Sequence, residues 1–189
     1  MNEAKTQSRP QLRIKELAMI ALLTAVTCIL APLSIPIGEV PISLTNLVIY
    51  FSLYILGMKK GILSYIVYLL IGFVGVPVFS GYTSGPQKLL GPTGGYLIGF
   101  LPMALIAGLV IGRHYKKTVL CFLAMAAGTA VCYAFGTAWL AHVGGYSLKA
   151  ALFAGVVPFI PGDLIKMGLA AVLGPQIRKQ LVRARLLED

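Results

Sequence analysis

The chain has 189 residues and a mass of 20.2 kDa; 58% of its residues are hydrophobic, only 12% are charged, and the mean hydropathy is +0.86. Soluble domains carry about 45–50% apolar and about 25% charged residues, so this chain has too few charges to cover a water-facing surface. A soluble enzyme is therefore excluded, and so is a disordered chain, which needs low hydrophobicity and high charge. We interpret residues 1–189 as a single domain embedded in a lipid bilayer.

The net charge of +10 does not indicate nucleic-acid binding, because the basic residues lie at the ends of apolar runs and form no soluble basic face. The three cysteines lie in apolar stretches, with no spacing typical of a disulfide framework or a metal site. The sequence also lacks a P-loop and the common hydrolase motifs. We expect no metal, no cofactor and no catalytic activity.

Six apolar runs account for most of the sequence, and each is long enough to supply one helix across the roughly 20 residues that a bilayer requires. The runs are residues 17–38, 40–58, 61–87, 89–112, 118–148 and 150–177, of which the last is interrupted only by Asp163 and Lys166. The second run predicts a short helix near residues 43–56, and the third run ends in a loop that begins near Gly75. The fold class we predict is all-α, an integral membrane bundle of six transmembrane helices.

The distribution of lysine and arginine predicts the orientation of this bundle. With six helices, both termini and the second and fourth loops share one side of the membrane. That side holds 13 of the 16 basic residues, the other side holds Lys88 and Lys149, and Lys166 lies within a span. Because basic residues concentrate in cytoplasmic loops, we expect both termini to be cytoplasmic. Residues 1–10 form a polar N-terminal tail, and residues 178–189 form a basic C-terminal tail suited to the inner membrane surface.

Asp163 and Lys166 are the strongest candidates for function. Each charge costs about 2.5–3.5 kcal/mol near the centre of a membrane helix, and their i, i+3 spacing places both on one helix face. The preceding Pro158-Phe-Ile-Pro-Gly segment interrupts any helix, which places Asp163 where a new helix would be capped. The pair either marks a substrate or ion path or forms a structural ion pair, and we favour the first interpretation.

A second candidate is the glycine-rich loop that runs from Ser80 to Tyr96. Thr93 is placed to cap the following helix, and Gly94 and Gly95 allow a ligand to approach the backbone closely. Lys88 in the same loop can receive an anion or remain a solvated loop lysine. The alternative interpretation of the segment is an ordinary long connection.

Small and amide side chains supply further candidates. Ala21 and Ala25 form a small-xxx-small pattern, which favours close approach of another helix, and Ala104 and Gly108 form a second one that we assign to packing within the bundle. Asn46 is a buried-amide candidate, either for a ligand or for a hydrogen bond between helices.

Four segments resemble the signature segments of the BioY family. They are Val40-Pro-Ile-Ser-Leu-Thr-Asn-Leu, Gly75-Val-Pro-Val-Phe, Leu90-Gly-Pro-Thr-Gly-Gly-Tyr-Leu-Ile-Gly-Phe and Pro158-Phe-Ile-Pro-Gly-Asp-Leu-Ile-Lys. BioY proteins are the biotin-specific substrate-binding subunits, or S components, of bacterial energy-coupling factor transporters. The resemblance runs from the first apolar run to the last and covers nearly the whole chain.

The resemblance implies a multi-pass protein of the bacterial plasma membrane that captures biotin on its outer face. It further implies docking on a transmembrane coupling protein that is attached to two cytoplasmic ATPases, with Ala21 and Ala25 on the docking face. Asp163 and Lys166 suit the ureido ring of biotin, while Thr93, Gly94, Gly95 and Tyr96 suit its other polar groups.

Two alternatives of different classes remain at this point. The chain can be a stand-alone small-molecule carrier driven by protons through Asp163. It can also be an assembly protein in which the Asp163–Lys166 pair only holds helices together.

Overall fold

The computed structural model describes residues 14–36, 40–184 and 186–187. Within these residues it contains seven helices and two short strands. The helices are α1 (Ile14–Leu30), α2 (Thr45–Phe73), α3 (Pro86–Leu90), α4 (Gly94–His114), α5 (Thr118–Gly144), α6 (Leu148–Gly155) and α7 (Ile160–Arg183), and the strands are β1 (Ser34–Ile35) and β2 (Ile42–Ser43). The predicted all-α class is confirmed, since the strands pair over only two residues each.

Three helices, α2, α4 and α5, are long and apolar enough to cross a membrane by themselves. The pair α6 and α7 is a fourth candidate, bent by 48° at the break between its two parts. The break contains Pro158, as the sequence predicts, and Pro161 lies in the first turn of α7, where a missing N–H group leaves no hydrogen bond unmade. The last apolar run therefore forms two helices joined at a bend, in agreement with the interruption predicted at Pro158.

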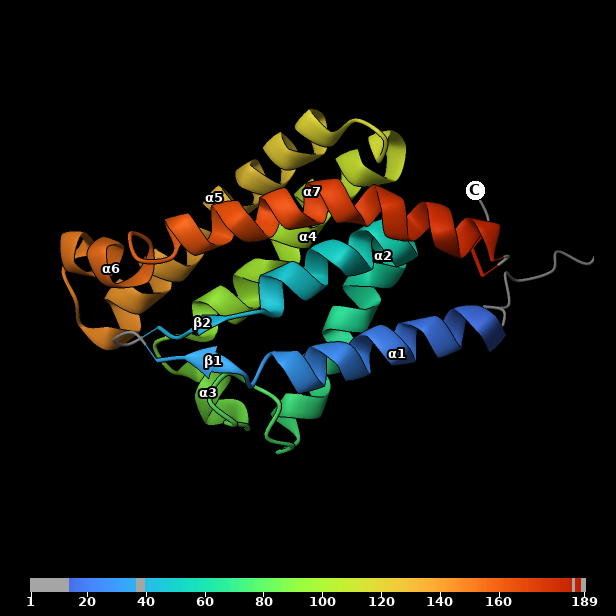
Figure 1. Ribbon diagram of the computed structural model, residues 1–189. Coiled ribbons are helices and arrows are strands. Elements are labelled where there is room, and N and C mark those ends of the chain that lie inside the picture. Colours follow the sequence, from blue (N-terminus) through green and yellow to red (C-terminus); the bar gives the residue numbers. More distant parts are fainter. Residues whose placement is uncertain (1–13, 37–39, 185, 188–189) are drawn as a thin grey trace, which may run out of the picture.

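Helix α2 joins the second and third apolar runs of the sequence. Gly57 interrupts it with φ +74° and ψ 175°, a backbone conformation that glycine adopts without strain. Figure 1 shows the chain changing direction at this kink. The first half of α2, residues 45–56, matches the short helix predicted near residues 43–56. The second half ends at Phe73, which agrees with the loop predicted to begin near Gly75.

The helices pack around a core of large aromatic and aliphatic side chains. Tyr50, Tyr54 and Tyr68 of α2 are fully buried, together with Met103 of α4 and Met125 of α5. Many other apolar side chains lie on the outside, where a bilayer provides an apolar solvent.

Glycine permits the closest helix contacts. A Cβ atom on Gly108 would approach Met58, and Ala104 is fully buried, so the small-residue face of α4 packs within the bundle as predicted.

The two ends of the bundle differ in their elements. The beginning of α1 and the end of α7 lie at one end, and β1, β2, α3 and α6 lie at the other (Figure 1). The predicted N-terminal tail, residues 1–10, and part of the predicted basic tail lie outside the described residues.

Candidate ligand-binding site

The site is built where α7 begins beside the start of α2. Asp163 lies in the first turn of α7, so its backbone N–H already donates to the Phe159 carbonyl and its side chain is free to point into the bundle. The predicted role of Asp163 as a helix cap is wrong, because Phe159 occupies that position. Lys166 follows one turn later on the same face, and both residues are over 90% buried.

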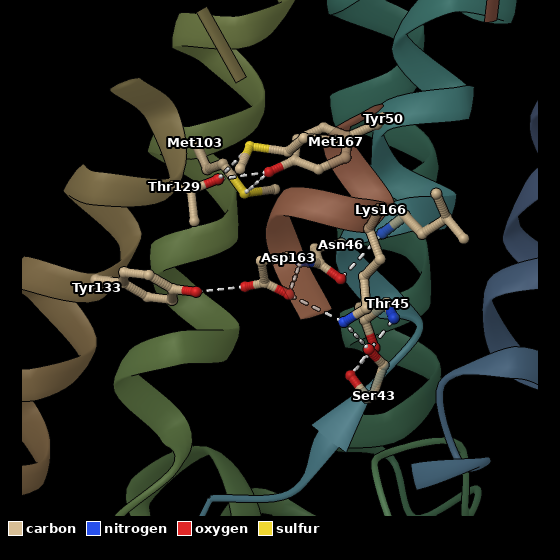
Figure 2. Close-up of polar contacts among 11 residues, drawn as sticks. Ser43, Thr45, Asn46, Tyr50, Met103, Thr129, Tyr133, Asp163, Lys166 and Met167 are labelled. Atoms are coloured by element: carbon tan, nitrogen blue, oxygen red, sulfur yellow. Dashed lines mark hydrogen bonds and ion pairs between the residues drawn. The ribbon is translucent and has the colours of Figure 1, made fainter. Parts of the chain in front are cut away.

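Asp163 is the centre of a polar network that Figure 2 shows. Its Oδ1 accepts hydrogen bonds from Asn46 Nδ2 at 2.8 Å and from Lys166 Nζ at 3.0 Å. Its Oδ2 accepts one from the Tyr133 hydroxyl at 2.6 Å. Three donors from α2, α5 and α7 therefore meet one carboxylate, which compensates for the cost of burying its charge.

Lys166 connects this network to the strand segment. Its Nζ also donates to the Ser43 carbonyl at 2.7 Å, and the Ser43 hydroxyl lies 2.9 Å from the Thr45 hydroxyl. Asn46 is fixed in turn, because its Oδ1 accepts from the Leu47 N–H at 3.1 Å. The start of α2 is thus held against α7 by polar contacts.

A second polar cluster lies deeper in the bundle. The Tyr50 hydroxyl is 2.6 Å from Thr129 Oγ1 and 3.4 Å from the sulfur of Met103. Thr129 also donates to the carbonyl of Met125 at 2.8 Å. This cluster contacts the pocket through Thr129, so the floor of the site is fixed as well as its walls.

These side chains border a narrow pocket with a cavity volume of about 60 Å³. Small-molecule sites have mostly apolar walls and a few placed polar groups. Asp163, Lys166 and Asn46 line one part of this pocket. Apolar and aromatic walls come from four other residues, Val40, Tyr96, Phe100 and Phe159.

Five of the predicted site residues share this pocket, namely Asn46, Thr93, Tyr96, Asp163 and Lys166. Thr93 occupies the N-cap position of α4, as predicted, but its side chain makes no capping hydrogen bond to the helix backbone.

Gly94, Gly95 and Lys88 lie outside the residues that line the pocket. The two glycines permit close packing, since a Cβ atom on Gly94 would overlap the Leu89 carbonyl and one on Gly95 would overlap Trp139. Trp139 in turn donates to the Gly91 carbonyl at 3.0 Å, which fixes the loop before α4. Lys88 is half-buried in α3, and this burial lowers its pKa by removing water from the ammonium group.

Sequence reasoning missed Tyr133, Ser43 and Thr45 as members of the site. Tyr133 lies 30 residues before Asp163 and is one of nine tyrosines, so nothing in its own neighbourhood distinguishes it. Its role is set by the packing of α5 beside α7. Ser43 and Thr45 lie in the Val40–Leu47 segment, which was singled out for resemblance and not for chemistry.

Ala21 and Ala25 lie far from these residues in the fold, on α1. Both are exposed, and both line a shallow apolar groove together with Cys28 and Val67. Thr24 lines the same groove, is buried, and has its hydroxyl 3.0 Å from the Ser64 hydroxyl of α2.

The fold and the site together define a multi-pass membrane protein with a buried, charged ligand pocket. The sequence profile of the BioY family matches residues 3–183. The chain belongs to the BioY family.

Curated relatives and one solved structure agree with this assignment. The probable biotin transporter BioY of Pyrococcus horikoshii is 36% identical over 167 residues, which cover 88% of this chain and 98% of the relative. The biotin transporter BioY of Thermotoga maritima is also 36% identical over 167 residues, covering 88% of this chain and 97% of that protein. A crystal structure at 2.1 Å of the S-component for biotin from an ECF-type ABC transporter is similar with a TM-score of 0.78 and 31% identity, covering 91% of this chain and 95% of that chain.

Proposed function

We propose that this chain is the biotin-binding S component of an energy-coupling factor transporter, a transport component rather than an enzyme. The observation that carries the proposal is the Asp163–Lys166 pair, buried in a pocket whose other walls are largely apolar. The relatives named above carry biotin in their names, and the similar crystal structure is that of an S-component for biotin.

The hydrogen-bonding capacity left at the pair fits a ureido group. A carboxylate offers about four acceptor positions and an ammonium group three donors. Among the described residues, Asp163 already accepts three hydrogen bonds and Lys166 donates two. One acceptor position on Oδ2 and one N–H on Lys166 therefore remain. A ureido ring offers an N–H group for the first and a carbonyl oxygen for the second.

The bicycle and the carboxylate tail of biotin match the chemical character of the remaining pocket residues. Its apolar bicycle suits the walls formed by Tyr96, Phe100 and Phe159. The carboxylate tail leads towards the mouth, where Thr93 and Ser80 supply hydroxyl groups. We assign Gly95 to packing the start of α4 against Trp139, Gly94 to close packing against Leu89, and Lys88 to a weaker, longer-range attraction of the tail.

Six membrane crossings with both termini in the cytoplasm are part of this proposal. The six segments are α1, the two halves of α2 on either side of Gly57, α4, α5 and the bent pair α6–α7. The beginning of α1 and the end of α7 share one end of the bundle, as an even number of crossings requires (Figure 1). The pocket then opens towards the outside.

Delivery of biotin requires a partner, which we propose to be a transmembrane coupling protein attached to two cytoplasmic ATPases. The exposed Ala21 and Ala25 place two small side chains one turn apart on α1, so another helix can approach closely there.

Isothermal titration of the purified chain against biotin, biotinamide and an unrelated vitamin tests the ligand. We expect tight binding of biotin, weaker binding of biotinamide and no binding of the unrelated vitamin. A monodisperse protein that binds none of them would overturn the function. Uptake of labelled biotin into proteoliposomes, with and without ATP and the coupling proteins, then separates an S component from a proton-driven carrier. Uptake that follows a proton gradient without ATP would favour the carrier.

A further inference from the structure

A basic groove lies at the opposite end of α7 from the pocket. It is lined by Tyr115 and Lys116 after α4 and by Pro175, Gln176, Lys179, Val182 and Arg183 of α7. Its three cations come from two parts of the chain that are about 60 residues apart, yet the fold brings them to one hollow. Pro175, Val182 and the ring of Tyr115 give it apolar walls.

These cations have no acidic partner within the part of the chain that the structure describes. The described residues include two acidic side chains, and both are already paired: Glu16 with Lys60 at 2.7 Å and Asp163 with Lys166 at 3.0 Å. Lys116, Lys179 and Arg183 are all exposed. A bound anion would complement them.

One wall of the groove is held in place from behind. The guanidinium carbon of Arg178 lies 4.5 Å from the centre of the Tyr115 ring, a cation–π geometry. Arg178 also donates to the Tyr54 carbonyl at 3.2 Å, which ties this contact to the core of α2. The groove is therefore fixed before any ligand arrives.

The α7 face that lines the groove changes from apolar to cationic along its length. Leu169, Val172, Gln176, Lys179 and Arg183 follow at spacings of three and four, so they lie on one helix face. Leu169 is 46% exposed and Val172 is 53% exposed, as expected for side chains that meet acyl chains. An amphiphile with an acyl part beside Leu169 and an anionic group beside Lys179 matches this order.

We propose that this groove binds the anionic headgroup of a phospholipid. Lys116, Lys179 and Arg183 contact the phosphate, and Tyr115 packs against the glycerol region. The site is independent of the biotin pocket, because twenty residues of α7, about 30 Å of helix, separate Asp163 from Arg183. The inference requires only that these helices cross a bilayer.

Native mass spectrometry of the full chain in detergent tests the proposal, with equal amounts of phosphatidylglycerol and phosphatidylcholine added. Both lipids carry a phosphate, but only phosphatidylglycerol has a net negative charge. We expect retention of phosphatidylglycerol over phosphatidylcholine by about tenfold, on the scale of the attraction of a few basic residues for anionic lipid. The variant K116Q/K179Q/R183Q should bring this ratio close to one.

The variant K59Q/K117Q/K149Q is the matched control. It removes the same total charge from three exposed lysines that do not line the groove, and it should keep the wild-type ratio. Both variants should elute as the wild type does and bind biotin with unchanged affinity, so a failure here is distinct from a failure of the proposed function.

Four results would overturn the lipid site. The first is a wild type without a lipid preference, and the second is an equal loss of preference in both triple variants, which would assign the effect to overall charge. The third is displacement of phosphatidylglycerol by millimolar inorganic phosphate, which would make the groove a site for free phosphate. The fourth is a groove variant that keeps its lipid preference but no longer assembles with the coupling protein, which would make the groove a protein contact.

Discussion

The charged residues at the two ends of α7 differ in burial and in pairing. At its beginning, Asp163 and Lys166 are buried and paired, and hydrogen bonds from α2 and α5 reach the same carboxylate. At its end, Lys179 and Arg183 are exposed, and neither forms an ion pair with an acidic side chain of the described residues. A buried pair is expensive to break, because one partner is left charged without compensation. Removing an exposed cation costs little free energy. The beginning of α7 should therefore govern ligand affinity, and the end of α7 should govern only membrane contacts.

The largest effect is expected at the buried end. Asp163→Asn should weaken biotin binding by about 100-fold or more, because it removes a charged acceptor and leaves Lys166 buried without a counter-charge. Titration calorimetry measures the loss. Lys179→Gln, on the same helix, is the control and should leave the affinity unchanged. Equal affinity in a monodisperse D163N protein would make the pair structural and remove the contrast between the two ends.

A second large effect should appear in transport without appearing in binding. Replacing Ala21 and Ala25 by Trp should reduce biotin uptake at least about tenfold by blocking close approach of a partner helix to α1. Biotin affinity should change by less than about twofold, since neither residue lines the pocket.

Uptake by proteoliposomes and copurification with the coupling protein measure the effect of A21W/A25W. The matched control is Leu22→Trp, an exposed residue of the same helix that does not line the groove. If binding and assembly fall together in the double variant, α1 supports the pocket and the docking face lies elsewhere.

A smaller effect is expected for Tyr133→Phe. The tyrosine hydroxyl donates to Asp163 Oδ2 at 2.6 Å, and a hydrogen bond to a charged group contributes about 1.5–3 kcal/mol. A water molecule or the ligand itself can replace part of this contribution, so we expect biotin affinity to fall about tenfold. Tyr82→Phe, an exposed tyrosine in the loop before α3, is the control. An unchanged affinity for Y133F would show that Asn46 and Lys166 alone orient the carboxylate.

The buried end of α7 was easier to predict than its surroundings. Two charges inside an apolar run are costly wherever the chain folds, so Asp163 and Lys166 stand out from sequence alone. Tyr133 carries no such signal, because an aromatic residue in a membrane helix is ordinary until a tertiary contact gives it a partner. Thr93 was placed correctly at the start of α4, but its backbone φ of −89° and ψ of −6° are helical rather than the extended values typical of a cap.

Prediction of the number of helices was limited by the same lack of tertiary information. Charge-free runs locate apolar segments but not the breaks within them. Gly57 divides one helix at a position where Lys59 and Lys60 follow closely, so the charges marked the boundary even though the backbone remains largely helical. Pro158 marked the break before α7 directly, because proline removes a backbone donor. The short α3 had no such marker.

The smallest effect should come from Lys88, the one predicted site residue that is charged and lies outside the pocket lining. If it attracts the carboxylate tail of biotin, Lys88→Gln should weaken biotin binding by at most about fivefold, because a single partly exposed ion pair contributes about 1 kcal/mol or less, and binding of neutral biotinamide should not change. Lys149→Gln is the matched control on the same proposed side of the membrane.

Burial lowers the pKa of Lys88, so its charge is lost at a lower pH than that of an ordinary lysine. The preference for biotin over biotinamide should therefore decline as the pH is raised into the alkaline range, and K88Q should show no such decline. A decline of equal size in K88Q would assign it to another group and leave Lys88 as a solvated loop residue.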